Sequence, residues 1–511
     1  MNKKESEKKR KAADLTELAE EMGIPVVFPA NVIKKADTVP LRVSEADAEG
    51  REDFREELTI TIDGPDAKDL DDAVSLTRLE DGYLLKVHIA DVSFYVPESS
   101  ALDREAKKRG TSVYLGDTVI PMLPRRLSNG ICSLNEGEDR LVLTVIMEFD
   151  PAGKLRCHRI AEGLIRVDRR MSYPEVREIL MDKESALLEQ YERFVPMLRD
   201  MQELAERLRA RRKKRGAIDF DFPEVHFLFD EEGWPIEAVP EWADCATRLI
   251  EEFMLAANET VAEEFARKDV PFIYRVHEEP DMEKAEAMIA LIRKNGGSIS
   301  KKGKNLLPLE IQKAVDSMRG LPGEALVTQM ILRSMQQARY SERCTGHFGL
   351  AARYYCHFTS PIRRYPDLQI HRIIRDVLRK EENEDRKMRH YRQIAAETAE
   401  HSSLTERRAV EAERESVKLL FCEYLSGRIG EIFDGRVSSV VRWGVYVRLP
   451  NMAEGLVHVS RLNEDYFSYD AASGAMVGRL GGKTICVGDP LKVRLLGVDT
   501  ERRIIDFEPY P

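Results

Sequence analysis

The chain has 511 residues, of which 43% are hydrophobic and 33% are charged, and its net charge at pH 7 is −11. No stretch approaches the roughly 18 uninterrupted apolar residues of a membrane helix, and the charged N-terminus lacks the apolar core of a signal peptide. The seven cysteines are scattered without a Cys-x-x-Cys pair, which argues against a disulfide framework or a zinc site. We therefore expect a cytoplasmic protein with reduced thiols, large enough to divide into about two to four domains.

The expected elements follow the chain in blocks. Residues 1–50 form a polar lead-in segment with a short helix near Asp14–Met22 and few core signals. Alternating apolar residues from Glu56 to Pro97 predict antiparallel strands, and the run at 141–149 predicts a buried strand. Amphipathic patterns predict helices over 185–215, 243–268, 281–295, 308–342 and 365–425. Residues 51–425 therefore predict an α+β catalytic domain, with a strand-rich floor and helices around it.

The tail, residues 427–511, changes to short strands punctuated by glycine. The pattern G-x-V followed by G-x-Y-V-x-L and EGLVHVSRL looks like the five-stranded OB-fold barrel first described in a ribosomal protein. On such a barrel Trp443, Tyr446 and His458 would lie near the ligand face, where aromatic rings stack on bases. Phe433 fits the barrel core better. The tail therefore predicts an RNA-binding domain.

A run of aspartates is the most informative local feature. Asp63, Asp69, Asp71 and Asp72 lie within ten residues, after a strand-like TITI segment and a Gly-Pro turn. Carboxylates this close repel one another unless a cation lies among them, which predicts a divalent-metal site, most simply for Mg²⁺. An EF-hand calcium loop counted from Asp63 would need oxygen ligands where proline and alanine stand. A solvated surface turn is the remaining alternative, and the apolar strands on both sides argue against it.

A second run, YYCHFTSPIRRYPDLQIHR, spans Tyr354–Arg372. Together with the aspartate run it resembles the ribonuclease II and ribonuclease R (RNB) family of 3′-to-5′ exoribonucleases, with ribonuclease R as the best match. Further matching stretches occur in family order between about residues 50 and 425: HIADVSFYV, RGTSVYL, LSNGICSLNEGEDR, RGAIDFDFPEV, LIEEFMLAANETVA and PFIYRVHEEP. The resemblance implies an RNB catalytic domain over 51–425, followed by the barrel over 427–511.

The resemblance also implies a mechanism. The family hydrolyses RNA processively from the 3′ end with one or two Mg²⁺ ions, releasing nucleoside 5′-monophosphates and a short end product. Carried onto this sequence, Asp63 and Asp72 bind metal and Asp69 is a supporting ligand. Asp71 also faces the metal, and its loss should reduce catalysis most. Arg363 matches the catalytic arginine, whose guanidinium suits a phosphate in the transition state.

Other family positions imply contacts to RNA. Tyr114 matches the tyrosine that stacks on the 3′-terminal base, and its aromatic partner is either Phe272 or Tyr274. Arg364 faces another phosphate or only forms a salt bridge. Glu413 resembles a glutamate that contacts a base. A threaded single strand suits a monomer, and RNA is the expected partner, with no membrane.

Two histidines within the second run, His357 and His371, invite a general-base role. Because metal ions can activate water, packing or RNA contact is the better interpretation of both.

Two other classes of function stay open at this point. One is an RNA-binding regulator that turns RNA over poorly, which the acidic net charge makes plausible. The other is a metal phosphohydrolase acting on a small nucleotide, for which an RNA-binding barrel would be useless. Ribonuclease R ordinarily carries two cold-shock domains before the catalytic domain, and the matching region here begins near residue 51. Either a naturally short form or a trimmed longer protein would account for that.

Overall fold

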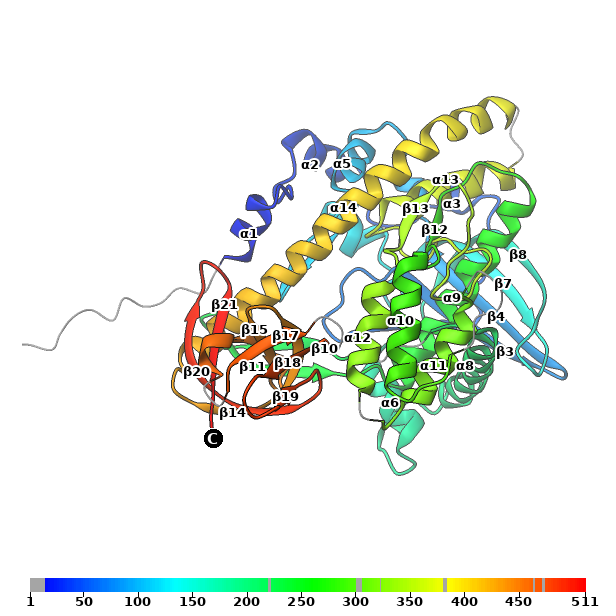
Figure 1. Ribbon diagram of the computed structural model, residues 1–511. Coiled ribbons are helices and arrows are strands. Elements are labelled where there is room, and N and C mark those ends of the chain that lie inside the picture. The colour runs from blue at the N-terminus through cyan, green and yellow to red at the C-terminus, as the bar shows by residue number, and fades with distance from the viewer. Residues whose placement is uncertain are drawn as a thin grey trace, which may run out of the picture.

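The computed structural model describes residues 14–218, 222–299, 306–321, 323–379, 384–462, 465–470 and 474–511. Within that part, a mixed helix-and-strand body is followed by a closed barrel, as expected from the sequence (Figure 1). Three residues of the RGAIDFDFPEV stretch, 219–221, lie outside the described part.

One seven-stranded sheet forms the floor of the body. Its strand order is β1-β8-β7-β4-β3-β2-β9. The five central strands pair antiparallel, whereas β9 is parallel to β2 and β1 is parallel to β8. The strands are β1 (Glu52–Asp53), β2 (Ile60–Asp63), β3 (Asp72–Leu79), β4 (Gly82–Ala90), β7 (Asp139–Phe149), β8 (Leu155–Arg166) and β9 (Arg169–Ser172).

Helices cover both faces of this sheet, because its strands are apolar on both sides. One face packs on α6, α8 and α9, and the other on α2, α4 and α5. α13 contributes to both cores, with Leu368 in one and Ile370 in the other. The bounds are α4 (Val92–Tyr95), α5 (Ala101–Arg109), α6 (Tyr173–Met181), α7 (Leu187–Gln190), α8 (Val195–Arg215), α9 (Cys245–Arg267) and α13 (Tyr365–Arg379).

The described part of the lead-in segment, residues 14–50, differs from the expectation of few core contacts. The predicted short helix is α1 (Leu15–Glu21), and it is followed by α2 (Ala30–Asp37) and α3 (Glu45–Ala48). Leu15 and Ala19 are buried against Ala409 and Ala412 of α14, and Val32 is buried under the sheet. Each short helix buries only a narrow apolar stripe, and its other residues are polar. Its composition therefore does not reveal that it packs on the core.

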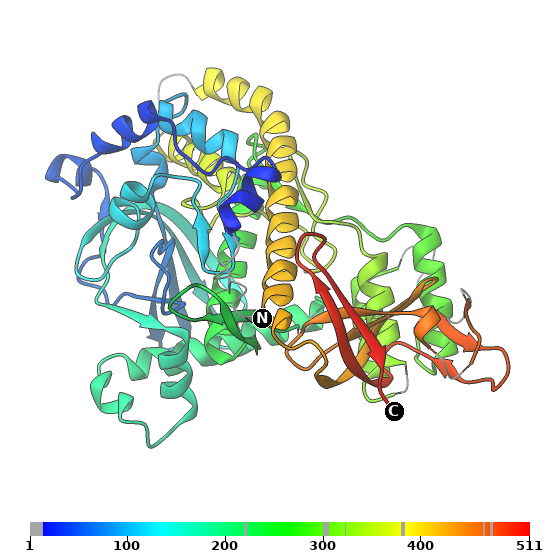
Figure 2. The ribbon, with the colours of Figure 1, turned by 90° about the vertical axis from the view of Figure 1, so that its left-hand side faces the viewer.

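The long helix α14 (Glu384–Ser426) runs from the body to the barrel (Figure 1). It stands between the floor sheet and the barrel when the molecule is turned by 90° (Figure 2). Two short hairpins lie along its length, β5 (Val113–Leu115) with β6 (Thr118–Ile120), and β10 (Glu224–Phe229) with β11 (Pro235–Glu241). α14 therefore links the two halves of the protein.

Three helices form a small insert with a core of its own. These are α10 (Met282–Lys294), α11 (Pro308–Met318) and α12 (Glu324–Ser334). A ribbon of β12 (Tyr274–Val276) and β13 (Arg339–Ser341) connects the insert to the body. The helix expected over 308–342 is thus two helices followed by a strand.

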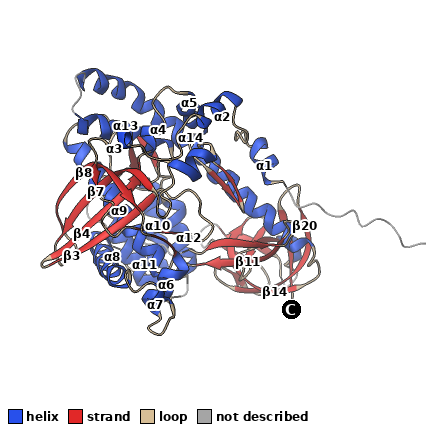
Figure 3. Cartoon of the chain, turned by 180° about the vertical axis from the view of Figure 1, so that it is seen from behind, coloured by secondary structure: helices blue, strands red, loops and turns tan. Residues whose placement is uncertain are grey.

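The tail closes into a five-stranded barrel in the order β14-β15-β16-β21-β20, as the glycine-punctuated strands predict. Its strands are β14 (Ile432–Val441), β15 (Gly444–Arg448), β16 (Glu454–His458), β20 (Pro490–Asp499) and β21 (Ile504–Pro509). A small sheet of β17 (Phe467–Asp470), β18 (Ala475–Gly478) and β19 (Thr484–Ile485) is inserted between β16 and β20. The floor sheet and the barrel lie at opposite sides of the molecule (Figure 3).

All seven cysteines are free thiols. Among the described residues, every helix is too short or too polar to cross a membrane.

Candidate active site

The two motifs meet, although they are far apart in sequence. The aspartate run forms the loop that leaves β2 and enters β3. Asp71 at the end of this loop accepts a hydrogen bond from the backbone N–H of Ile362 at 2.8 Å, across 291 residues of chain. Its other oxygen, Oδ2, lies 3.7 Å from Nε of Arg363. Asp71 therefore joins the aspartate loop to the arginine turn.

The arginine turn, residues 360–364, is held in place by a buried carboxylate. Asp367 accepts the backbone N–H of Ser360 at 2.9 Å. The hydroxyl of Ser360 in turn accepts a hydrogen bond from Nη2 of Arg363 at 3.1 Å. The Arg363 side chain remains 41% exposed, so its guanidinium can reach a ligand.

The neighbouring arginine behaves differently. Arg364 donates to both carboxylate oxygens of Asp367, with the shortest distance 2.6 Å. Asp367 is fully buried, and this ion pair occupies the guanidinium of Arg364. Of the two roles expected for Arg364, the structure shows the salt bridge, and a contact with a phosphate stays a prediction.

Burial and mutual repulsion raise the pKa values of the aspartates. Burial raises the pKa of Asp63 to about 8, with a further increase from Asp72, while Arg170 acts against it. Burial also raises the pKa of Asp72 to about 6, and it raises that of Asp71 well above its ordinary value, Arg363 opposing both. Asp69 adds to the repulsion felt by Asp63 and Asp71. The carboxylates of this loop therefore act on one another electrostatically, as expected for like charges close together.

Two carboxylate oxygens at this site fit a divalent cation. Oδ2 of Asp63 and Oδ2 of Asp71 are buried without a hydrogen-bond partner, and such oxygens need a proton or a cation. Carboxylate oxygens are also the ligands that Mg²⁺ prefers. Among the described residues, no three carboxylate, histidine or cysteine side chains already converge as a metal cage. The individual ligand assignments therefore stay predictions. Asp66, a fifth aspartate of the same run, is exposed.

Tyr114 lies beside the aspartates. Its hydroxyl donates to Oδ2 of Asp69 at 3.3 Å. The segment before β5 pairs with the arginine turn, because the Ser112 N–H donates to the Arg363 carbonyl at 2.9 Å. The neighbouring Thr111 forms a β-bridge with Arg364. The structure thus brings together Tyr114, the aspartate loop and Arg363, which three separate sequence stretches supply.

Both rings that were predicted as the aromatic partner of Tyr114 are buried. Phe272 is 1% exposed and stacks on Phe265 with ring centroids 4.8 Å apart. Tyr274 is also buried in the main core. Neither ring presents a face to a base, so both assignments as substrate-binding residues are corrected. The apolar run PFIYRV is the sequence signal for this burial.

Tyr173 is a half-buried residue that the sequence interpretation missed. It is the first residue of α6, directly after the strand in which Ser172 pairs with Asp63. Burial raises the pKa of its phenol, and Asp72 and Asp63 add to the effect. The pairing of β9 with β2, which sequence alone does not show, places this ring beside the aspartates.

The histidines have structural partners. His371 is fully buried, and its Nε2 lies 2.8 Å from the Phe358 carbonyl. Nδ1 of His357 lies 2.8 Å from the Tyr340 hydroxyl. Burial lowers the pKa of both imidazoles, so both are neutral near pH 7. These contacts agree with the expected packing role. Glu413 is exposed on α14, and its contact with a base stays a prediction.

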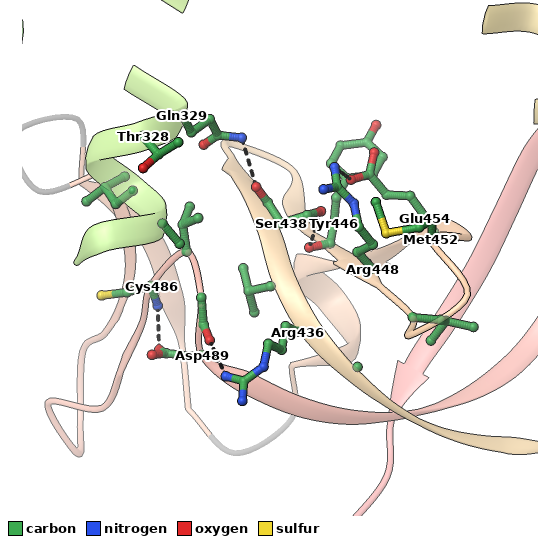
Figure 4. A pocket seen from close by; sticks show the side chains of 18 of the residues that line it. Thr328, Gln329, Arg436, Ser438, Tyr446, Arg448, Met452, Glu454, Cys486 and Asp489 are labelled. Atoms are coloured by element: carbon green, nitrogen blue, oxygen red, sulfur yellow. Dashed lines mark hydrogen bonds and ion pairs between the residues drawn. The ribbon is translucent and has the colours of Figure 1, made fainter. Parts of the chain in front are cut away.

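A groove of about 2260 Å³ lies between the barrel, α12 and α14. Tyr446 lines it, and Figure 4 shows it with Arg436 and Arg448 of the barrel and Gln329 of α12. Basic side chains of α12 and α14 line it as well. Gln329 of α12 donates to the Ser438 carbonyl of β14 at 2.8 Å and so joins the insert to the barrel. The basic side chains that line the groove include Arg333, Arg414, Lys418, Arg436, Arg448 and Arg503.

The other barrel residues lie away from this groove. Trp443 is 52% exposed and His458 is exposed, and the strand pairing of Gly444 with His458 places the two near each other. Phe433 is half-buried against the barrel core, as expected. The barrel thus presents Tyr446 inside the groove, and Trp443 with His458 outside it.

Comparison with known proteins matches both parts of the chain. Residues 51–380 match the RNB domain family, and residues 427–508 match the S1 RNA binding domain family. The chain is 46% identical over 499 residues to Ribonuclease R 1 of Lactococcus lactis, covering 98% of this chain and 61% of that protein. It is 45% identical over 489 residues to Ribonuclease R of Thermotoga maritima, covering 94% and 68%. The chain thus spans about two thirds or less of the length of these relatives.

The fold also matches a solved structure. Mycoplasma genitalium RNase R in complex with ribose methylated single-stranded RNA superimposes with a TM-score of 0.91 at 28% identity, covering 97% of this chain and 77% of that one. The RNB match covers more than half of the chain, and the joined aspartate and arginine motifs lie within it. On this evidence the protein belongs to the RNB family, to which its ribonuclease R relatives also belong.

Proposed function

We propose that this protein is a Mg²⁺-dependent, processive 3′-to-5′ exoribonuclease that hydrolyses RNA to nucleoside 5′-monophosphates and a short end product. The observation that carries the proposal is the contact of Asp71 with both Ile362 and Arg363. It brings buried carboxylates with unpartnered oxygens next to an exposed guanidinium. The names of the relatives support the same activity, although this chain spans only part of their length.

The protein's own groups have distinct tasks in this reaction. The Arg363 guanidinium is positioned to bind the scissile phosphate through two N–H groups and to offset the negative charge that grows in the transition state. Asp71 and Ser360 hold it there without occupying all of its donors. Asp63, Asp69, Asp71 and Asp72 would hold Mg²⁺. When bound, Mg²⁺ supplies an activated water and stabilises the leaving 3′-oxygen.

RNA is held by stacking and charge rather than by reading its bases. The Tyr114 ring, next to Asp69, would stack on the terminal base, since every base offers a π face. The basic groove beside the barrel would receive the strand, and Tyr446 adds an aromatic surface within it. Eight basic and four acidic side chains line this groove, an excess of positive charge on a protein whose net charge is −11. A small-nucleotide hydrolase would have no use for it. A cytoplasmic location and a monomeric state stay predictions.

An end-labelled RNA time course tests this proposal. With Mg²⁺ we expect mononucleotides and a residual fragment of a few nucleotides, and with EDTA intact RNA. Asp71→Asn should reduce the rate by roughly 10³-fold or more, because it removes a buried charge at the reaction centre. RNA binding by this variant, measured in a gel shift, should be retained. Intact RNA under every condition with binding preserved would favour the RNA-binding regulator, and cleavage of free nucleotides alone would favour the small-nucleotide hydrolase.

A further inference from the structure

Arg170 of β9 holds the loop that carries the aspartates. Its Nη2 donates to the Pro65 carbonyl at 2.9 Å and to the Ala67 carbonyl at 2.6 Å. The parallel pairing of β9 with β2 places Arg170 opposite Thr61, two residues before Asp63. The Arg170 side chain can therefore reach the loop that follows Asp63. One guanidinium nitrogen therefore fixes the first half of the loop.

The second half of the loop has a separate support. The hydroxyl of Ser133 donates to the Lys68 carbonyl at 2.9 Å and accepts the N–H of Leu70 at 3.1 Å. Ser133 is fully buried and its position does not depend on Arg170. Loss of Arg170 should therefore release residues 65–67 while the approach to Asp71 stays in place.

If only its charge mattered, Arg170 would weaken the binding of a cation at this site. It lies close enough to Asp63 to oppose the repulsion among the carboxylates. A positive charge there repels a divalent cation. A role limited to charge and a role in loop geometry thus predict opposite effects of its removal on Mg²⁺ affinity.

We propose that Arg170 is a positioning residue of the divalent-metal site, holding the Pro65–Ala67 segment so that Asp63 and Asp69 face the same ion. This role rests on the proposed function, since it requires that the aspartates bind Mg²⁺. Removing a residue that orients a metal ligand typically lowers the metal affinity by about 10- to 100-fold.

The test compares three variants in the full chain. Arg170→Met keeps the length of the side chain and removes its charge and donors, and Arg170→Lys keeps the charge on a shorter stem. Arg169→Met is the matched control, because Arg169 is the preceding residue of β9 and contacts Glu136 and Tyr191 instead of the loop. Melting temperatures in EDTA would establish that each variant is folded.

Mg²⁺ affinity would be measured without RNA, from the rise in melting temperature with Mg²⁺ concentration, and with Mn²⁺ by electron paramagnetic resonance. We expect Arg170→Met to weaken binding by about 10- to 100-fold, Arg170→Lys to lie between it and the unmodified protein, and Arg169→Met to stay within about twofold. At saturating Mg²⁺, the RNA cleavage rate of Arg170→Met should partly recover.

Unchanged or tighter Mg²⁺ binding by Arg170→Met would overturn the positioning role and leave the proposed function intact. An equal loss in Arg169→Met would also overturn it, because the effect would then belong to β9 as a whole. Failure of the unmodified protein to bind either metal would instead overturn the metal site of the proposed function, and this role with it.

Discussion

The aspartate–arginine site and the barrel groove are built in opposite ways. At the site, the groups that position Arg363 are buried. Asp71 accepts from Ile362, Asp367 accepts from Ser360 and Ser360 accepts from Arg363, at 2.8–3.1 Å. The groove is wide and lined by partly exposed basic side chains, and its walls are joined by contacts such as that between Gln329 and Ser438.

This difference separates two physical demands. Transition-state stabilisation requires groups fixed in advance in a poorly solvated place, because reorganisation during the reaction costs rate. Holding RNA of any sequence requires charge and flat rings that tolerate different bases. Mutations at the site should therefore cause large changes in the rate constant or in the stability of the protein. Mutations in the groove should cause smaller changes in RNA affinity.

The adjacent arginines provide the strongest test of this contrast. Arg363→Met should lower kcat by about 10²- to 10³-fold with little effect on stability, since its side chain is 41% exposed and is proposed to bind the scissile phosphate. Arg364→Met should instead destabilise the protein by about 3–5 kcal/mol, because it leaves the fully buried Asp367 without its ion-pair partner. Single-turnover kinetics and urea unfolding measure the two effects. The reverse pattern would assign catalysis to Arg364.

Loss of an aromatic ring should have a smaller effect, and only on binding. Tyr446→Ala should weaken binding of single-stranded RNA by about 1–3 kcal/mol, the cost of one lost stacking interaction, with kcat at saturating RNA unchanged. Trp443→Ala is the comparison, because this exposed ring was predicted on the same ligand face but lies outside the groove. Fluorescence anisotropy would compare the two. A larger loss for Trp443→Ala would place the RNA path on the other side of the barrel.

The stability of the protein should also depend on pH. The pKa values of Asp63 and Asp72, about 8 and about 6 in the folded protein, exceed the ordinary value of 3.8. The folded state therefore keeps protons that the unfolded state has lost. In EDTA, the stability contributed by these groups should be highest below about pH 4 and should fall as the pH rises to about 8.

Mg²⁺ should reverse this trend, because it binds the ionised carboxylates. Its stabilising effect on the melting temperature should be larger at pH 8 than at pH 6, which differential scanning fluorimetry can measure. The double variant Asp63→Asn/Asp72→Asn should flatten the pH dependence in EDTA. An equal Mg²⁺ effect at both pH values would mean that the ion binds elsewhere.

Much of the protein follows from its sequence. The fold class, the antiparallel floor strands and the main helices were predicted from apolar period, a property of neighbouring residues. The closed barrel was predicted from the resemblance of the glycine-punctuated tail to a known barrel. The aspartate run and the arginine turn were recognisable for the same reason, because each is contiguous. The contribution of residues 14–50 to the core was not recognisable from the sequence, since only a narrow stripe of each short helix is buried.

Only the tertiary structure decided which chemically similar residues serve the site. Arg363 and Arg364 are adjacent and identical in type, but Arg363 contacts Asp71 and Ser360 whereas Arg364 pairs with the buried Asp367. Phe272 and Tyr274 were plausible stacking rings until packing buried them, while strand pairing brought Tyr173 and Arg170 to the aspartates. Such outcomes depend on partners from distant parts of the chain. Local pattern can specify that a side chain is buried or exposed, but its partner is set by the packing of the whole chain.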